Sequence, residues 1–247
     1  MKLLRTANSL VIIFVLSACI QTKTYTTNQV GLESMGTPMY CGTFSSYVYY
    51  TSNDSVLVND SLTTVANRIY DSIIRRRLRK VEFAKKIDVS EEQIAKELSM
   101  NLLTIINYAG KNNKIRNCNI TDVFKKITQP FSNNYFIFFV PTGYTRSKQN
   151  YYKLKEEREK KQATYAAASV IGTFFAMALT GGVGLVAFVP TGTPVKEQGS
   201  NCHLIVYDKK NNEIEFYRQQ FFTIEGHPPL ERKYIKSQVE YIFKEYL

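Results

Sequence analysis

The chain has 247 residues, of which 44% are hydrophobic, so its length and composition suit one sizeable globular domain or two small ones. The 17 Tyr and 15 Phe residues, with no Trp, favour strands and aromatic packing and argue against a purely helical protein. The expected fold class is therefore α/β (α+β), a small mixed β-sheet packed with amphipathic helices. The formal net charge of +11 would make nucleic acid a plausible partner for a cytoplasmic protein.

Residues 1–18 have the pattern of a secretory signal peptide. Lys2 and Arg5 are followed by the apolar run 10–16, which is too short to span a bilayer, and then by Leu-Ser-Ala before Cys19. Leu-Ser-Ala-Cys resembles the lipobox of bacterial lipoproteins. This resemblance implies cleavage before Cys19, a diacylglycerol (with palmitate-type acyl chains) on its thiol and acylation of the new amine. An ordinary signal peptide and an uncleaved anchor are the alternatives.

Export removes nucleic acid from the expected partners. Loss of Lys2 and Arg5 with the signal lowers the net charge from +11 to +9. The expected partners are the membrane, through the lipid anchor, and another envelope protein or an acidic envelope polymer. Assembly into a homo-oligomer is a further alternative that the sequence leaves open. Ile20 is followed by no acidic cluster, which resembles lipoproteins sorted to the outer membrane with the domain in the periplasm; the inner membrane and the cell surface are alternatives.

The stretch 20–38 is rich in Thr, Gln, Asn, Ser and Gly without a helical or strand period. Together with Cys19 it is predicted to form a flexible tether, residues 19–38, that spans roughly 25 Å. Residues 39–247 are predicted to form a single mixed α/β domain with an apolar insert at 165–189.

The first half of the domain predicts one strand and three helices. Residues 39–50 alternate like a strand, and Asp60 is placed to cap a helix that ends near residue 78. A capping box at residues 90–93 opens a helix to about residue 108, and 119–128 predicts a short helix. The expected inward residues are Leu62, Val65, Ile69, Ile73 and Leu78 in the first helix, and Ile94, Leu98, Leu102, Ile105 and Ile106 in the second.

A basic run ends the first of these helices. It consists of Arg75, Arg76, Arg77, Arg79 and Lys80. Cations are favoured at a helix C-terminus by the helix dipole, so a solvated helix end is one interpretation, and a patch for headgroups or a partner is the other.

The segment 135–140 is apolar on both faces, as a central strand covered on both sides requires. A charged helix is expected over 148–162, followed by 165–189, which contains no charged residue. The small residues Ala168, Gly172, Ala176 and Thr180 recur every four positions and predict a helix-packing stripe. Internal packing or a hairpin is one interpretation of the segment, and membrane insertion or self-association is the other.

A short sequence echo links the end of the central strand to a later segment. Pro141, Thr142 and Gly143 recur as Pro190, Thr191 and Gly192, each time after Phe-Val. Proline cannot donate within a ladder, so both are predicted to be turns that end a strand and, if the strands are parallel neighbours, form a binding surface. Chance similarity is the alternative.

The final third predicts a β-hairpin, with strands at 204–207 and 214–224, and a closing helix with one apolar face. This layout resembles envelope lipoproteins whose domain is similar to the N-terminal domain of TolB, including those similar to the curli-assembly lipoprotein. Cys19, the strand 135–140, the later apolar segment and the hairpin carry the resemblance over about 110 residues. It implies a role in assembly or transport at the envelope.

No motif points to catalysis. His203 and His227 are the only histidines and lie outside any metal-ligand spacing, so no metal or cofactor is expected. Cys202 and His203 are adjacent on a predicted strand, where successive side chains point to opposite faces. Disulfide pairing among Cys41, Cys118 and Cys202 stays open. The expected function is that of a membrane-anchored periplasmic lipoprotein with a non-catalytic binding or assembly role. The alternatives are a membrane-inserting or oligomer-forming lipoprotein that uses 165–189, and a hydrolase of unknown type.

Overall fold

The fold is organised around the strand β6 (Tyr135–Arg146), which lies inside an eight-stranded mixed sheet. The computed structural model describes residues 20–28, 31–51, 56–84, 92–164, 195, 197–222 and 230–247. On one side β6 pairs along most of its length with the antiparallel strand β7 (Gln198–Asp208). On the other side it pairs first with β2 (Met39–Thr43) and then with β3 (Ser46–Tyr50), both parallel to it.

The remaining strands extend this sheet to both edges. β8 (Glu213–Phe222) forms a hairpin with β7, and β1 (Ile20–Thr26) pairs antiparallel with β8 at the outer edge. At the other edge β5 (Glu82–Phe83) pairs with β2, and β4 (Val56–Val58) pairs with β3. The order across the sheet is β1-β8-β7-β6-β2-β5, with β3 and β4 continuing beside the second half of β6.

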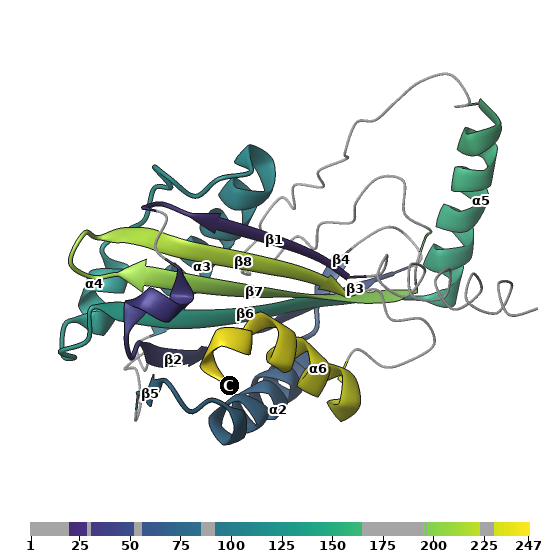
Figure 1. Cartoon of the computed structure of the whole chain (residues 1–247). Coiled ribbons are helices and arrows are strands. Elements are labelled where there is room, and N and C mark those ends of the chain that lie inside the picture. Colours follow the sequence, from purple (N-terminus) through teal and green to yellow (C-terminus); the bar gives the residue numbers. More distant parts are fainter. Residues whose placement is uncertain are drawn as a thin grey trace, which may run out of the picture.

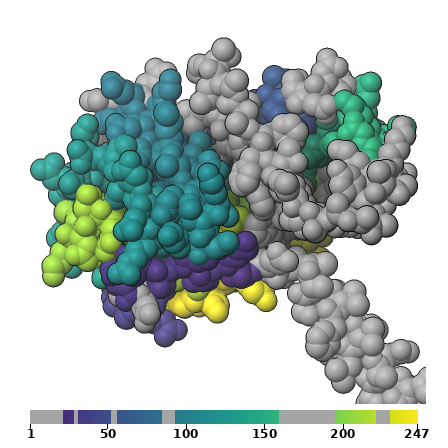
Figure 2. Space-filling model, turned by 90° about the horizontal axis from the view of Figure 1, so that it is seen from above, coloured from purple at the N-terminus to yellow at the C-terminus, as the bar shows by residue number. Residues whose placement is uncertain are grey.

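Helices cover both faces of the sheet, which gives a three-layer arrangement (Figure 1). One face carries α2 (Asp60–Arg77), α6 (Arg232–Ile242) and the short 3-10 helices η1 (Leu32–Met35) and η2 (Lys244–Tyr246). The other face carries α3 (Glu92–Asn112) and α4 (Val123–Thr128). The helix α5 (Lys148–Thr164) stands at the far end of the sheet from α4 (Figures 1 and 2).

The side chains of β6 alternate between two separate cores. Phe136, Phe138 and Val140 pack beneath α3 and α4, whereas Ile137 and Phe139 pack beneath α2 and α6. All five are buried, which confirms the prediction of a central strand covered on both sides.

The predicted fold class is confirmed, and most predicted elements are present. The helices α2, α3, α4 and α5, the hairpin of β7 and β8, and the closing helix α6 lie where the sequence placed them. The predicted inward residues of α3 are also confirmed, since Leu98, Leu102 and Ile105 are fully enclosed. The predicted apolar insert 165–189 lies outside the described residues.

The buried face of α2 is shifted by one position along the sequence from the predicted face. Ala66, Tyr70 and Ile74 are buried, whereas Val65 is 43% exposed. Tyr70 takes an inward position because its ring packs on Phe139 and its hydroxyl donates to Gln238 Oε1 at 2.5 Å. The prediction was based on the spacing of aliphatic residues and did not include a tyrosine whose hydroxyl has a buried hydrogen-bond partner.

The predicted flexible tether is wrong. Residues 20–26 form β1, which pairs with β8 at seven consecutive positions from Ile20 to Thr26. Tyr25 stacks on Tyr217 with ring centroids 5.9 Å apart, and Leu32 and Met35 are buried beneath the C-terminal end of the chain. The Thr-rich sequence is a strand because it completes the open edge of the β7–β8 hairpin, a tertiary interaction with no signature in the local pattern.

The predicted first strand, 39–50, is two strands, β2 and β3, separated by Phe44 and Ser45. This break also explains why the prediction of a turn at Pro141, Thr142 and Gly143 is wrong. The Phe139 carbonyl accepts from the Phe44 N–H at 2.8 Å. Main-chain groups two residues apart on a strand point the same way, so the main chain of Pro141 also faces the side of β2 and β3. There the partner of β6 changes from β2 to β3, and a missing N–H interrupts no ladder.

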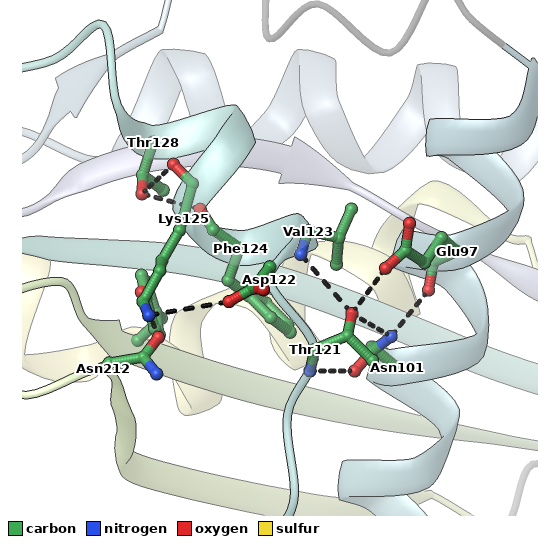
Figure 3. Close-up of polar contacts among 10 residues, drawn as sticks. Glu97, Asn101, Thr121, Asp122, Val123, Phe124, Lys125, Thr128 and Asn212 are labelled. Carbon is green, nitrogen blue, oxygen red and sulfur yellow. Dashed lines mark hydrogen bonds and ion pairs between the residues drawn. The ribbon is translucent and has the colours of Figure 1, made fainter.

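Side-chain hydrogen bonds join α3 to the start of α4 (Figure 3). Asn101 Oδ1 accepts from the Thr121 N–H at 2.9 Å, and its Nδ2 donates to Thr121 Oγ1 at 2.8 Å. The Thr121 hydroxyl in turn donates to Glu97 Oε1 at 2.8 Å. Because Asn101 is 6% exposed, this fully used amide fixes how α4 lies on the sheet.

The C-terminus is attached to β8 by a bidentate ion pair. Arg218 Nη1 and Nη2 each lie 2.7 Å from a carboxylate oxygen of Glu245. Burial alone raises the pKa of Glu245, but the hydrogen bonds and charge of Arg218 hold this pKa below its ordinary value. The pair therefore keeps η2 on the sheet across the neutral pH range.

We predict that Gly143→Ala destabilises the protein. A Cβ at this position would lie 2.3 Å from Cε1 of the enclosed Tyr47 ring, so the variant should lose about 2 kcal/mol of unfolding free energy in urea. Gly110→Ala is the control, because this exposed α3 glycine has open space and should gain about 0.5–1 kcal/mol. Equal stability of Gly143→Ala and the wild type would contradict the packing of Tyr47 on β6.

Candidate functional site

The described ends of several elements gather at one end of the sheet. β1, β4 and β7 begin there, and β3, β6 and β8 end there. Ile20, the residue after the predicted lipidation site, lies opposite Phe222, which lies opposite Ser200, which lies opposite Gly143. We call this the Ile20 end of the sheet. Along β6 it lies about 35 Å from the other end, at 3.3 Å per residue.

An arginine and two tyrosines form a compact cluster at the Ile20 end. The guanidinium of Arg146 lies over the Tyr50 ring, 4.2 Å from its centroid, and 4.9 Å from the centroid of Tyr144. The two rings meet edge to face with centroids 5.8 Å apart. Arg146 Nη1 donates to Oδ1 of the fully buried Asn150 at 2.9 Å. We call Arg146, Tyr50 and Tyr144 the arginine–tyrosine cluster.

No carboxylate of the described residues pairs with Arg146. Its Nε–H is enclosed and has no acceptor among these residues. Cation–π contacts with two rings stabilise the charge of the guanidinium without neutralising it.

Exposed apolar side chains lie at the same end. Leu57 and Val58 of β4 are 55% and 38% exposed, and Tyr152 of α5 is 62% exposed. α5 stands across the end of the sheet, on the side opposite α2 and α6 (Figure 1). The Ile20 end therefore combines a cation that pairs with no carboxylate of the described ranges with exposed apolar and aromatic groups.

The face beneath α3 carries a buried histidine. His203 Nδ1 lies 2.9 Å from the Tyr217 hydroxyl, and its Nε2 lies 3.4 Å from the hydroxyl of Thr142, one of the residues predicted to form a turn. Burial lowers the pKa of His203 from 6.5 to about 3, so the ring is neutral at neutral pH. It serves as a structural hydrogen-bond partner between β6, β7 and β8.

Cys202 points to the opposite face, as the sequence predicted for adjacent strand residues. Its sulfur lies 3.8 Å from the Tyr70 hydroxyl in the core beneath α2 and α6. Burial raises the pKa of the Cys202 thiol to about 12, and a thiol in this state is a poor nucleophile. Cys41, Cys118 and Cys202 are free thiols.

The basic run lies away from the Ile20 end. It follows the last turns of α2 and leads into β5, beside the start of β2 and β6. Arg75 pairs with Asp71 and lies over the Phe83 ring, and Arg77 pairs with Glu240. Arg76, Arg79 and Lys80 are exposed, so three of the five predicted cations are open to a partner.

The other predicted site residues are distributed as follows. Pro141, Thr142 and Gly143 are buried inside β6, while Cys19, Pro190, Thr191, Gly192 and the stripe Ala168, Gly172, Ala176 and Thr180 lie outside the described residues. Within the described ranges, no group of three or more His, Cys, Asp or Glu side chains is placed to hold a metal ion. None of the described helices has the length and apolarity of a membrane span.

Sequence reasoning missed Arg146, Tyr144 and Tyr50 as a group. The predicted strand ended at residue 140, although Thr142, Tyr144 and Arg146 continue its two-residue period past Pro141. That continued alternation was the available signal, because it places Tyr144 and Arg146 on one face.

Comparisons with known proteins give only distant likenesses. No family model matches the chain, and no curated protein matches it. Among solved structures, the PelC dodecamer from Paraburkholderia phytofirmans aligns with 92% of this chain and 96% of its own at 8% identity and a TM-score of 0.33. A point variant of that protein gives a TM-score of 0.34 with the same coverage and identity. TM-scores below 0.5 do not establish a shared fold.

We predict a pH-dependent contribution of His203 to stability. The unfolded chain binds a proton below about pH 6.5 while the folded chain does not until about pH 3, so the free energy of unfolding falls as pH falls through this window. The slope from this residue approaches about 1.4 kcal/mol per pH unit. Urea unfolding of the wild type and His203→Gln between about pH 7 and about pH 5 should show a smaller slope for the variant. Equal slopes would contradict a buried neutral His203, because His227 is common to both proteins.

Proposed function

We propose that the chain is a lipid-anchored protein of the bacterial cell envelope with a non-catalytic binding or assembly role. Its Cys19 carries the diacylglycerol of a lipoprotein, in the outer membrane, with the domain on the periplasmic side. The lipobox-like Leu-Ser-Ala-Cys supports the modification, and the absence of an acidic cluster after it supports the outer membrane address.

The pairing of β1 with β8 from Ile20 onward adds an orientation to this proposal, which the sequence alone did not supply. A strand that begins one residue after the lipidated cysteine leaves no slack between the acyl chains and the sheet. The membrane then lies at the Ile20 end, and the domain keeps one distance from the headgroups. Such fixed geometry suits a protein that presents a surface to another envelope component.

The exposed cations of the basic run suit the partner-binding role. Arg76, Arg79 and Lys80 lie near the opposite end of the sheet, about 35 Å from the membrane in this arrangement. They face the compartment rather than the headgroups, so their partner is an acidic envelope polymer or the acidic surface of an envelope protein.

A second candidate function is membrane insertion or oligomer formation through residues 165–189. α5 begins directly after β6, and β7 begins at the same end of the sheet as β1. The two described elements that flank the apolar segment are thus attached to the membrane-facing end in the arrangement above.

Cys19→Ala tests the anchor. The variant should lose incorporation of labelled fatty acid and leave the membrane fraction, because each buried methylene contributes about 0.8 kcal/mol to membrane attachment. Cys118→Ala is the matched control, since it removes a half-buried thiol and should keep both label and membrane attachment. Label retained on Cys19→Ala would exclude lipidation at this residue.

Protease digestion of cells whose outer membrane has been permeabilised distinguishes the binding or assembly role from membrane insertion. For a protein that only rests on the membrane, segment 165–189 should be digested as readily as the loops of the domain. A protected fragment spanning 165–189 would instead favour insertion. Mass spectrometry of the membrane-bound peptides gives the readout.

A further inference from the structure

We propose that the arginine–tyrosine cluster binds phospholipid headgroup phosphates, and that the exposed Leu57 and Tyr152 at the same end of the sheet reach into the membrane interface. This proposal rests on the lipidation of Cys19. It assigns a membrane contact surface to residues far from Cys19 in the sequence and gives the domain a defined orientation on the bilayer.

The register of the sheet places Arg146 at headgroup depth. Ile20, Phe222, Ser200 and Gly143 form one row across β1, β8, β7 and β6. Three strand spacings separate Ile20 from Gly143, about 14 Å, and Arg146 lies three residues, about 10 Å, further toward the end. Consecutive Cα atoms are about 3.8 Å apart, so the residue that carries the lipid is within that distance of Ile20. Arg146 therefore lies beyond the attachment point of the lipid, on the membrane side.

The chemistry of the cluster suits a phosphate ligand. A guanidinium presents a planar fork of N–H donors that matches phosphate and is less strongly hydrated than an ammonium group. Arg146 is held over Tyr50 and Tyr144 and by one bond to the buried Asn150, and no described carboxylate competes for it. Tyr144 is buried and Tyr50 is half-buried, so the two rings hold the guanidinium in place rather than enter the membrane themselves.

The exposed apolar groups at the Ile20 end favour a lipid surface over a protein partner, because Leu57 lies on the face of the sheet opposite the cluster and both faces meet the membrane at this end. Leu57 on β4 and Tyr152 on α5 come from separate elements and leave more than half of each side chain exposed. Both elements lie at the Ile20 end, where the acyl chains on Cys19 bring the bilayer. Contact with the interface removes this apolar surface from water, at about 25 cal/mol per Å².

The first test places a photoreactive phenylalanine analogue at Leu57, at Tyr152, or at Arg76 in the full-length protein in cells. After irradiation, mass spectrometry should find phospholipid adducts at positions 57 and 152 and none at position 76, near the opposite end of the sheet. Adducts with protein alone at 57 and 152, or equal lipid adducts at 76, would overturn the proposal. Fatty-acid labelling of the same samples separates the two hypotheses: label without lipid adducts removes only this inference, whereas loss of label removes the anchor.

The second test measures the role of Arg146. The lipidated protein with the photoreactive residue at position 57 is reconstituted into vesicles of phosphatidylethanolamine and phosphatidylglycerol. Arg146→Ala should lower the lipid-adduct yield about fivefold, and Arg146→Lys should lower it less, because the charge remains. Arg76→Ala is the matched control and should leave the yield unchanged. An unchanged yield in Arg146→Ala, with circular dichroism like that of the wild type, would exclude headgroup binding by this residue.

Discussion

The backbone ladder of β6 is the constraint on which the rest of the structure depends. Its 12 residues pair with β7 on one side and with β2 and then β3 on the other, and its side chains fill both cores. A strand whose apolar residues 136–140 are all buried cannot slip by one residue without exchanging the contents of the two cores. Its register therefore sets the direction of its neighbours and determines which element ends lie together.

This fixed direction connects the first described strand to the proposed membrane contact. Pairing of β6 with β7, and of β7 with β8, fixes the position of β8 relative to β6. β8 in turn pairs with β1 as far as Ile20. The position of Ile20 at the edge strand of the sheet is thus a consequence of packing some 120 residues later in the sequence. In the proposed arrangement one end of the sheet contacts the membrane and the exposed cations Arg76, Arg79 and Lys80 lie near the other.

Much of the fold could be predicted because local patterns report burial directly. The doubly apolar 135–140, the hairpin and α3 with Leu98, Leu102 and Ile105 all have the period that their packing requires. β1 could not be predicted, since its polar, Thr-rich sequence becomes a strand only through the open edge of β8. The predicted turn at Pro141 is wrong for a related reason, because whether a missing N–H breaks a ladder depends on the neighbouring strand.

The candidate site was less predictable than the fold. Tyr50, Tyr144 and Arg146 are nearly 100 residues apart at their widest, and only the parallel pairing of β3 with β6 brings them together. The cationic run 75–80 was visible in the sequence, but the pairing of Arg75 and Arg77 with internal carboxylates was not. Charge is readable from residue types, whereas availability of that charge requires the fold.

Hydrogen exchange at residues 22–26 of the membrane-attached protein tests most directly whether the chain folds up to its anchor. If β1 pairs with β8, the amides of this segment that face β8 exchange slowly, at rates close to those of the β7–β8 hairpin. Exchange of the whole segment at the rate of an unstructured peptide would show a flexible tether. That result would contradict the fixed position of the membrane at the Ile20 end.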